Sequence, residues 1–246
     1  ARVEIGNDGA VSRLAASLDI GEGRLRPGPD AQPFEFSGAR AEIDYDPATG
    51  RIAVPEVFAR TELVSLAAEG QLYLGDLAAG WPREVLAQFR LRDIAVAQGD
   101  VLAGPLAFDE AFADLRIALD PFALEIGRLQ LSGPLGRQDL RGRIGAARSG
   151  WRIALDLSAE EASVAEALAL WPLALAPGVR RWVRGNVREG TLRDFEMAIR
   201  MVPDTPRHAG MSFAFEGAKV KPMRGLPPIT GAAGLVSLSD GRFAVD

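Results

Sequence analysis

The chain has 246 residues, 48% of them hydrophobic and 25% charged, a balance that indicates a folded globular protein and excludes a disordered one. Its net charge of -5 offers no basic surface to a nucleic-acid backbone, so we expect no nucleic acid among its partners. Cysteine is absent, which excludes disulfides, zinc–thiolate sites and thiol catalysis but leaves the compartment open.

The chain begins Ala1-Arg2-Val3, without an initiator methionine or a charged and then apolar leader. We interpret it as a mature product or a piece of a longer protein. No segment reaches the roughly 18 consecutive apolar residues of a membrane-spanning helix. The nearest, 167–177, contains Pro172. Any membrane anchor is therefore expected outside this sequence.

Alternating apolar and polar runs, joined by turn residues, dominate the chain. Three pairs of runs form predicted hairpins: 41–45 with 51–54, 114–119 with 123–126, and 234–238 with 242–245. Further single runs lie at 151–157, 195–201 and 211–215. Since no long Ser/Gly linker divides the chain, we predict one continuous, mainly β structure built from hairpins across 1–246.

A helical pair is predicted at 159–187, between a hairpin-rich sheet at 1–158 and a continuing sheet at 188–246. Ser158 and Glu161 have the spacing of a capping box, and Val164, Leu168 and Trp171 follow at helical spacing before Pro172. These residues predict the first helix.

The second helix is predicted to begin at Pro177, because proline suits the first helical position. Val179, Trp182 and Val183 form its apolar stripe, and Gly185 is expected to end it. Two short helices inserted in a β chain are the most distinctive local feature of the sequence.

The helical region carries a family resemblance. Two blocks occur in the expected order over roughly the last third of the chain, and the first 150 residues match only in hairpin style. The first block is Leu170-Trp171-Pro172, Pro177, Arg181-Trp182-Val183, Asn186 and Gly190. The second is 215–220, 225–231, Gly234 and Ser237-Leu238. Together they resemble the AsmA-like proteins of Gram-negative bacteria, in particular the YhdP-type members.

This resemblance implies an elongated, curved antiparallel sheet that forms a repeating β-groove lined with apolar side chains. It also implies a periplasmic protein, tethered to the inner membrane by an anchor outside this chain, that moves phospholipid between the inner and outer membranes. The family offers no catalytic motif to carry over, and its Trp-Pro segment has no defined chemical role.

Alternation also predicts which residues form the apolar face. Such a face must be covered by another layer or by a ligand. A closed sandwich with a second sheet remains an alternative, because alternation is the same whether the partner is a sheet or an acyl chain. The candidate lipid-binding residues are Trp151, Ile153, Leu155, Leu157, Phe195, Met197, Ile199, Met201, Phe213 and Phe215.

Two interpretations of the helical tryptophans stay open. Trp171 and Trp182 could enter a membrane interface while the neighbouring arginines bind anionic head groups. Alternatively, both tryptophans pack on the sheet or close one end of the groove, and we favour this interpretation because amphipathic stripes usually face a core.

The sequence does not favour an enzyme. The single histidine, His208, lies in a proline-rich stretch that we expect to be exposed, and no nucleophile motif accompanies it. Asp44 and Asp46 share a strand face but lack the other ligands of a calcium loop. We therefore expect no catalytic residues, no metal site and no cofactor.

Two functions remain. The first is a periplasmic segment that binds and transfers phospholipid in an apolar groove. The alternative is an envelope scaffold with a packed β core, whose sheet edges pair with other envelope proteins. They differ in whether the apolar face holds lipid or is filled by protein.

Overall fold

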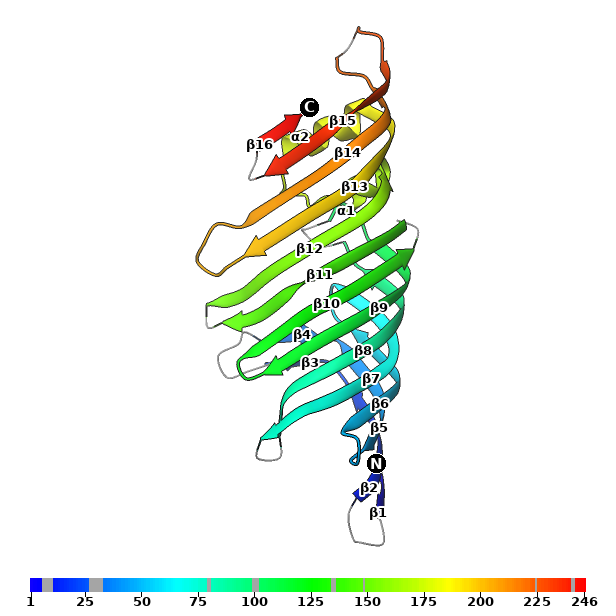
Figure 1. Ribbon diagram of the computed structural model, residues 1–246, viewed down its shortest axis with the longest axis vertical. Helices are drawn as coiled ribbons and strands as arrows, with labels where there is room; N and C mark the ends of the chain where they lie inside the picture. Colours follow the sequence, from blue (N-terminus) through cyan, green and yellow to red (C-terminus); the bar gives the residue numbers. More distant parts are fainter. Residues whose placement is uncertain are drawn as a thin grey trace.

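The computed structural model describes residues 1–5, 11–26, 33–78, 81–98, 102–133, 136–147, 149–223, 225–239 and 242–246. A sheet of 14 antiparallel strands, arranged in chain order, dominates the fold (Figure 1). Its strands are β1 (Arg2–Ile5), β2 (Val11–Ile20), β5 (Gly38–Asp46), β6 (Arg51–Arg60), β7 (Val64–Ala78), β8 (Trp81–Val96), β9 (Leu106–Leu119), β10 (Phe122–Gly133), β11 (Gly136–Ala147), β12 (Gly150–Ser163), β13 (Val187–Met201), β14 (His208–Val220), β15 (Ile229–Ser239) and β16 (Arg242–Val245).

Three smaller elements complete the fold. A hairpin of β3 (Gly23–Leu25) and β4 (Phe34–Phe36) is inserted between β2 and β5. Two helices, α1 (Val164–Leu170) and α2 (Pro177–Asn186), are inserted between β12 and β13. The predicted fold class, an elongated and curved antiparallel sheet with two short helices, is confirmed. The predicted hairpins are confirmed as β5–β6, β9–β10 and β15–β16.

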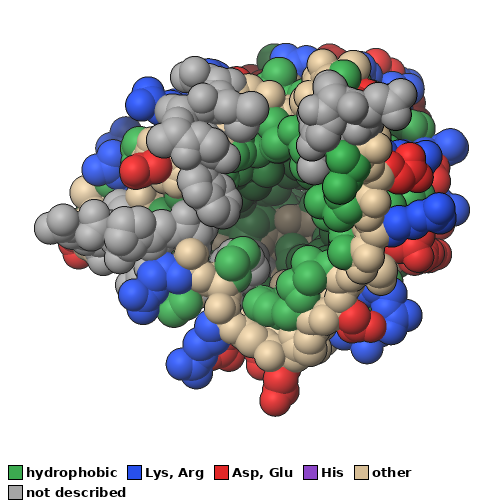
Figure 2. All heavy atoms as spheres, turned by 90° about the horizontal axis from the view of Figure 1, so that it is seen from below, with side chains coloured by type: hydrophobic (Ala, Val, Ile, Leu, Met, Phe, Trp, Pro, Cys, Tyr) green, Lys and Arg blue, Asp and Glu red, His purple; other side chains and the backbone are tan. Residues whose placement is uncertain are grey.

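The two faces of the sheet differ in chemistry. Because successive side chains of a strand point to opposite faces, the register fixes which residues share a face. On β11 and β12, Ile144 lies opposite Ile153. Figure 2, a view along the long axis, shows hydrophobic side chains lining a hollow and charged side chains on the outside. We call the side that lines the hollow the inner face and the side with the charged side chains the outer face.

Two irregularities in the strands share one sequence, Leu-Arg-Asp followed by an apolar residue. It occurs at 91–94 in β8 and at 192–195 in β13. Asp93 and Asp194 have φ values of 52° and 51°, in a left-handed region that aspartate enters more readily than most residues. The extra residue lets the leucine and the apolar residue after the aspartate both turn inward, as in a β-bulge. Ile94 and Phe195 are accordingly buried.

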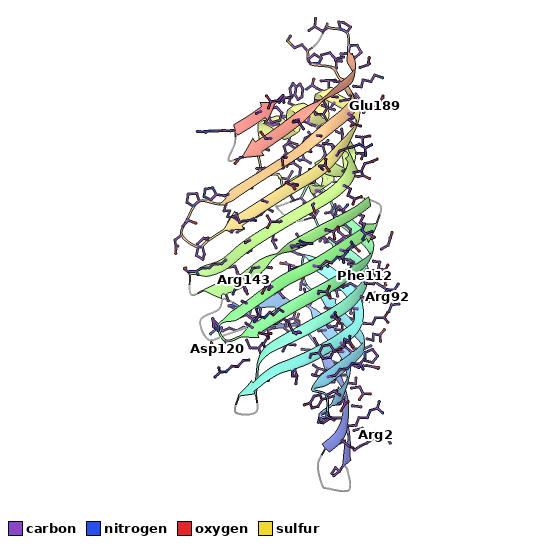
Figure 3. The ribbon with its side chains drawn as sticks, in the orientation of Figure 1. Arg2, Arg92, Phe112, Asp120, Arg143 and Glu189 are labelled. Atoms are coloured by element: carbon purple, nitrogen blue, oxygen red, sulfur yellow. The ribbon has the colours of Figure 1, made fainter. Side chains whose placement is uncertain are left out.

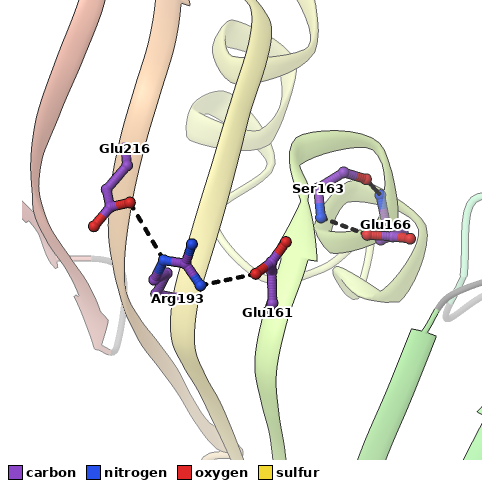
Figure 4. A network of polar contacts seen from close by, with 5 residues as sticks. All are labelled: Glu161, Ser163, Glu166, Arg193 and Glu216. Carbon is purple, nitrogen blue, oxygen red and sulfur yellow. Dashed lines mark hydrogen bonds and ion pairs between the residues drawn. The ribbon is translucent and has the colours of Figure 1, made fainter.

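The first helix begins later than predicted. Ser158 and Glu161 belong to β12, where they lie opposite Glu196 and Arg193 of β13, so the predicted capping box and the predicted start at 159 are wrong. Pairing with β13 keeps the chain extended as far as Ser163. The actual capping box is Ser163 with Glu166: the Ser163 Oγ accepts from the Glu166 N–H at 3.2 Å, and the Glu166 carboxylate accepts from the Ser163 N–H (Figure 4).

The second helix starts at Pro177 as predicted and ends at Asn186, one residue beyond the predicted end. One side-chain hydrogen bond lies within the segment between the helices, and another joins the two helices. Trp171 Nε1 donates to the Leu175 carbonyl at 2.7 Å, and Arg180 Nη2 donates to the Leu168 carbonyl at 2.9 Å, which satisfies an acceptor in the last turn of α1. Among the described residues, no helix has the length and apolar character needed to span a membrane.

Candidate functional site

The predicted lipid-binding residues lie together on the inner face. The sheet places β12, β13 and β14 side by side, so residues distant in sequence become neighbours. Across β12 and β13 the register pairs Ile153 with Met201, Leu155 with Ile199, and Leu157 with Met197. Trp151 contacts Phe122 of β10 edge to face, with 6.2 Å between ring centroids. All ten candidates therefore contribute to one continuous apolar surface.

Two of the ten candidates are covered by protein. Phe195 and Met197 are 1% and 8% exposed, because the helices and the segment between them pack over them. Phe195 also stacks against Phe213, with 6.1 Å between ring centroids. The other eight candidates are partly exposed. Phe195 and Met197 thus form a packed core, and the candidates on β12 remain accessible.

The inner face extends well beyond the predicted residues. From β5 to β11 the same alternation places further apolar side chains inward, and these are partly exposed: Ile43, Ile52, Leu72, Val85, Leu115, Ile117, Leu124 and Ile144. Their strands alternate as β12 does, so the signal was present in the sequence. Our prediction missed Leu72, Val85 and Ile144 because it identified no strand at β7, β8 or β11, and it missed the others because it did not align the predicted hairpins across a sheet.

The total surface is that of an open, elongated fold, as expected where part of the inner face has no second layer. A compact monomer of this mass exposes about 10,600 Å². This chain, of 26.2 kDa, exposes 15200 Å². A closed sandwich would bury its facing sides and approach the smaller value. The accessible part of the inner face, on β5 to β12, is therefore an apolar groove, and we use that name for it below.

Charged pairs between strands occupy the outer face. Figure 3 shows labelled residues of this surface, including Arg92 and Arg143. Arg116 Nη2 lies 2.6 Å from the Glu84 carboxylate, and the hydrogen bond from Arg116 lowers the pKa of Glu84. Such pairs keep one side of the sheet polar, and each adds little stability because both partners are exposed.

Arg193 links three strands on this outer face (Figure 4). Its Nη1 lies 2.7 Å from the Glu161 carboxylate on β12, and its Nε lies 3.3 Å from the Glu216 carboxylate on β14. The hydrogen bond to Glu216, followed by the charge of Glu161, raises the pKa of Arg193. Glu161, which was predicted to cap a helix, instead pairs charges across the sheet.

The helical tryptophans have different environments. Trp171 is 2% exposed and packs in the core beside Leu175, so a place in a membrane interface is wrong for it. Trp182 is 42% exposed on α2. The interpretation in which the tryptophans pack on the sheet therefore holds for Trp171, and an interface position for Trp182 stays a prediction.

His208, Asp44 and Asp46, the polar residues considered above for catalysis or metal binding, lie on strands or at a turn. His208 is exposed at the start of β14, in the strand and not in the preceding loop. Asp44 pairs with Arg13, and Asp46 accepts hydrogen bonds from Ala48 N–H and Thr49 Oγ1 within the turn after β5. Within the described parts of the chain, no three His, Cys, Asp or Glu side chains converge as a metal site would require.

Comparisons of the chain with protein-family models, with curated proteins and with solved structures each found no match.

Proposed function

We propose that the chain shelters the acyl chains of phospholipids in its apolar groove and so transfers lipid between two membranes. The observation that carries the proposal is the partly exposed apolar inner face, which crosses strand after strand behind a charged outer face (Figure 2). A hydrocarbon chain laid on this face would bury it as a second protein layer does in a sandwich.

A continuous groove suits this ligand energetically. Each methylene removed from water contributes about 0.8 kcal/mol, so sheltering ten of them contributes about 8 kcal/mol. A short pocket would leave most of the chain in water. The apolar residues that run from Ile43 on β5 to Leu157 on β12 provide contacts along such a length.

We also propose that the chain is a segment of an AsmA-like, YhdP-type protein in the Gram-negative periplasm, tethered to the inner membrane through an anchor outside this sequence. The support is the resemblance of the two sequence blocks, together with the curved sheet of sequential antiparallel strands that this resemblance implies. The proposal assigns no catalytic step and no cofactor to the chain.

The test is lipid binding with a charge placed on one face or the other of the same strand. Ile153 faces the groove and is partly exposed, so Ile153→Asp should fold yet reduce the uptake of a fluorescent phospholipid at least about tenfold, because the charge would be desolvated beside an acyl chain. Ala154 faces outward, opposite Arg143 and Arg200. Ala154→Asp should therefore keep wild-type uptake.

Organic extraction of the purified protein, followed by mass spectrometry, provides the second readout and should recover phospholipid. An extract without lipid, together with an Ile153→Asp variant that loses its folded circular-dichroism signal, would mean that the inner face is filled by protein. The envelope scaffold with strand-pairing edges would then replace this proposal.

A further inference from the structure

An apolar cavity of about 260 Å³ lies between the helices and the last strands. The cavity adjoins the packed core: Trp171 and Leu192 belong to the core and also line the cavity, whereas Phe195 and Met197 do not line it. Every residue that lines the cavity is apolar or glycine.

The cavity has a buried floor and an exposed mouth. On the floor, Trp171 is 2% exposed and Leu192 is 4% exposed. At the mouth, Trp182 of α2 is 42% exposed, and Phe243 and Val245 of β16 are 41% and 52% exposed. An apolar ligand could therefore enter past Trp182 and β16 without opening the core.

The lining restricts the class of ligand. A polar group placed inside would lose its hydrogen bonds to water and find no side-chain partner, and cavities with purely apolar walls stay dry. The volume is below the roughly 300–1,000 Å³ of sites that take a whole drug-sized molecule. A single narrow hydrocarbon chain meets both restrictions, whereas a lipid head group or two acyl chains side by side do not.

We propose that this cavity binds the end of one unbranched acyl chain, with the polar head left outside the mouth near Trp182. The inference rests on the lipid-sheltering function proposed above and adds to it a specific site for a chain end. A free fatty acid and one chain of a phospholipid share this chemistry, so the test includes both.

Two tryptophans in the lining make the test direct, because bromine quenches tryptophan fluorescence on contact. A variant with Trp81→Phe and Trp151→Phe retains only Trp171 and Trp182, both in the cavity. Dibromostearate, and vesicles of a phosphatidylglycerol with one dibrominated chain, serve as the probes. We expect saturable quenching by at least one probe, and the probe that quenches identifies the source of the chain.

Filling the cavity provides the matched comparison. Ala232 lines the cavity, whereas its neighbour Ala233 is exposed and does not. In the two-tryptophan background, Ala232→Phe should weaken quenching at least about tenfold by excluding several methylenes, and Ala233→Phe should leave it unchanged. If Ala232→Phe fails to fold, Val245→Phe at the exposed mouth and Ala244→Phe beside it repeat the comparison.

Two results would overturn the inference. One is a negative result in the quenching experiment: neither probe quenches, or the filling variants leave the quenching unchanged. The other is a concentration-dependent dimer in analytical ultracentrifugation that Val245→Phe abolishes, which would make a second copy of the chain the occupant. Lipid extraction and Ile153→Asp test the groove independently, so a failed cavity and a failed lipid function give different results.

Discussion

The groove and the helix-covered end of the sheet lie mainly on different strands, which alternate in the same way but bury different residues. Between β6 and β10 many of the buried residues are alanines, such as Ala68, Ala87 and Ala113, and the larger Ile94 and Phe108 form a small cluster with Ala111. Below the helices, Phe195 and Leu238 are each 1% exposed. Alternation therefore defines an apolar face, and the inserted helices turn one end of that face into the larger of two cores.

The largest expected effect comes from truncating an aromatic residue under the helices. Phe195→Ala should lower the free energy of unfolding by about 3–5 kcal/mol, because it removes a fully buried ring from a packed cluster. Ile117→Ala in the groove should cost only about 1 kcal/mol, since Ile117 is partly exposed. Urea denaturation measures both. Equal losses would mean that the helices do not create a distinct two-layer core.

At the helix-covered end of the sheet, the sequence predicted most elements correctly but not the start of the first helix. Strands 195–201 and 211–215 and the helix beginning at Pro177 were predicted correctly, because period-two alternation and proline at a helix start are local signals. The start of the first helix was wrong. Ser158 and Glu161 have the spacing of a cap, but the pairing of β12 with β13 outweighs it, and that partner lies beyond the helical insertion.

In the groove, the sequence predicted individual runs but not the extent of the apolar face. Runs in β5, β6, β9 and β10 were predicted from the sequence, whereas β7, β8 and β11 were not. The extent of the apolar face also depends on strand order and register, which no single run contains. The repeated Leu-Arg-Asp at 91–93 and 192–194 is a signal that could have been used. Aspartate between a charged and an apolar residue breaks strict alternation at the two irregular positions.

The second largest expected effect, after that of Phe195→Ala, tests what holds the helices over the sheet. Ser163→Ala removes the hydrogen bond to the Glu166 N–H and should lower the free energy of unfolding by about 1 kcal/mol. Ser158→Ala changes the same residue type on a strand of the same sheet and should have almost no effect. Thermal unfolding followed by circular dichroism compares them. If Ser158→Ala proves the more costly change, the cap has been assigned to the wrong serine.

The smallest expected effect tests whether surface charge holds the open part of the sheet together. Arg13 of β2 pairs with Asp44 of β5, and its hydrogen bond lowers the pKa of Asp44. A lowered folded pKa means that the pair contributes stability above the usual range of aspartate, near pH 4, and that this contribution disappears as the pH falls through the folded value. Asp44→Asn should therefore lower the melting temperature at pH 7, and its difference from wild type should vanish in acid.

The size of the difference in melting temperature between Asp44→Asn and wild type separates two explanations of the groove's stability. Both partners are solvent-exposed, so we expect less than about 2 °C at pH 7, shrinking further in high salt. Arg40→Gln, which removes the exposed pair with Asp19 on the same two strands, should have a similarly small effect. A loss of many degrees from either variant would mean that charge pairs, and not the backbone ladder and the apolar inner face, hold these strands together. Small losses from both variants would mean that the backbone ladder and the apolar inner face supply most of the stability of these strands. Because lipid is proposed to bind that inner face in the folded state, bound lipid should raise the melting temperature.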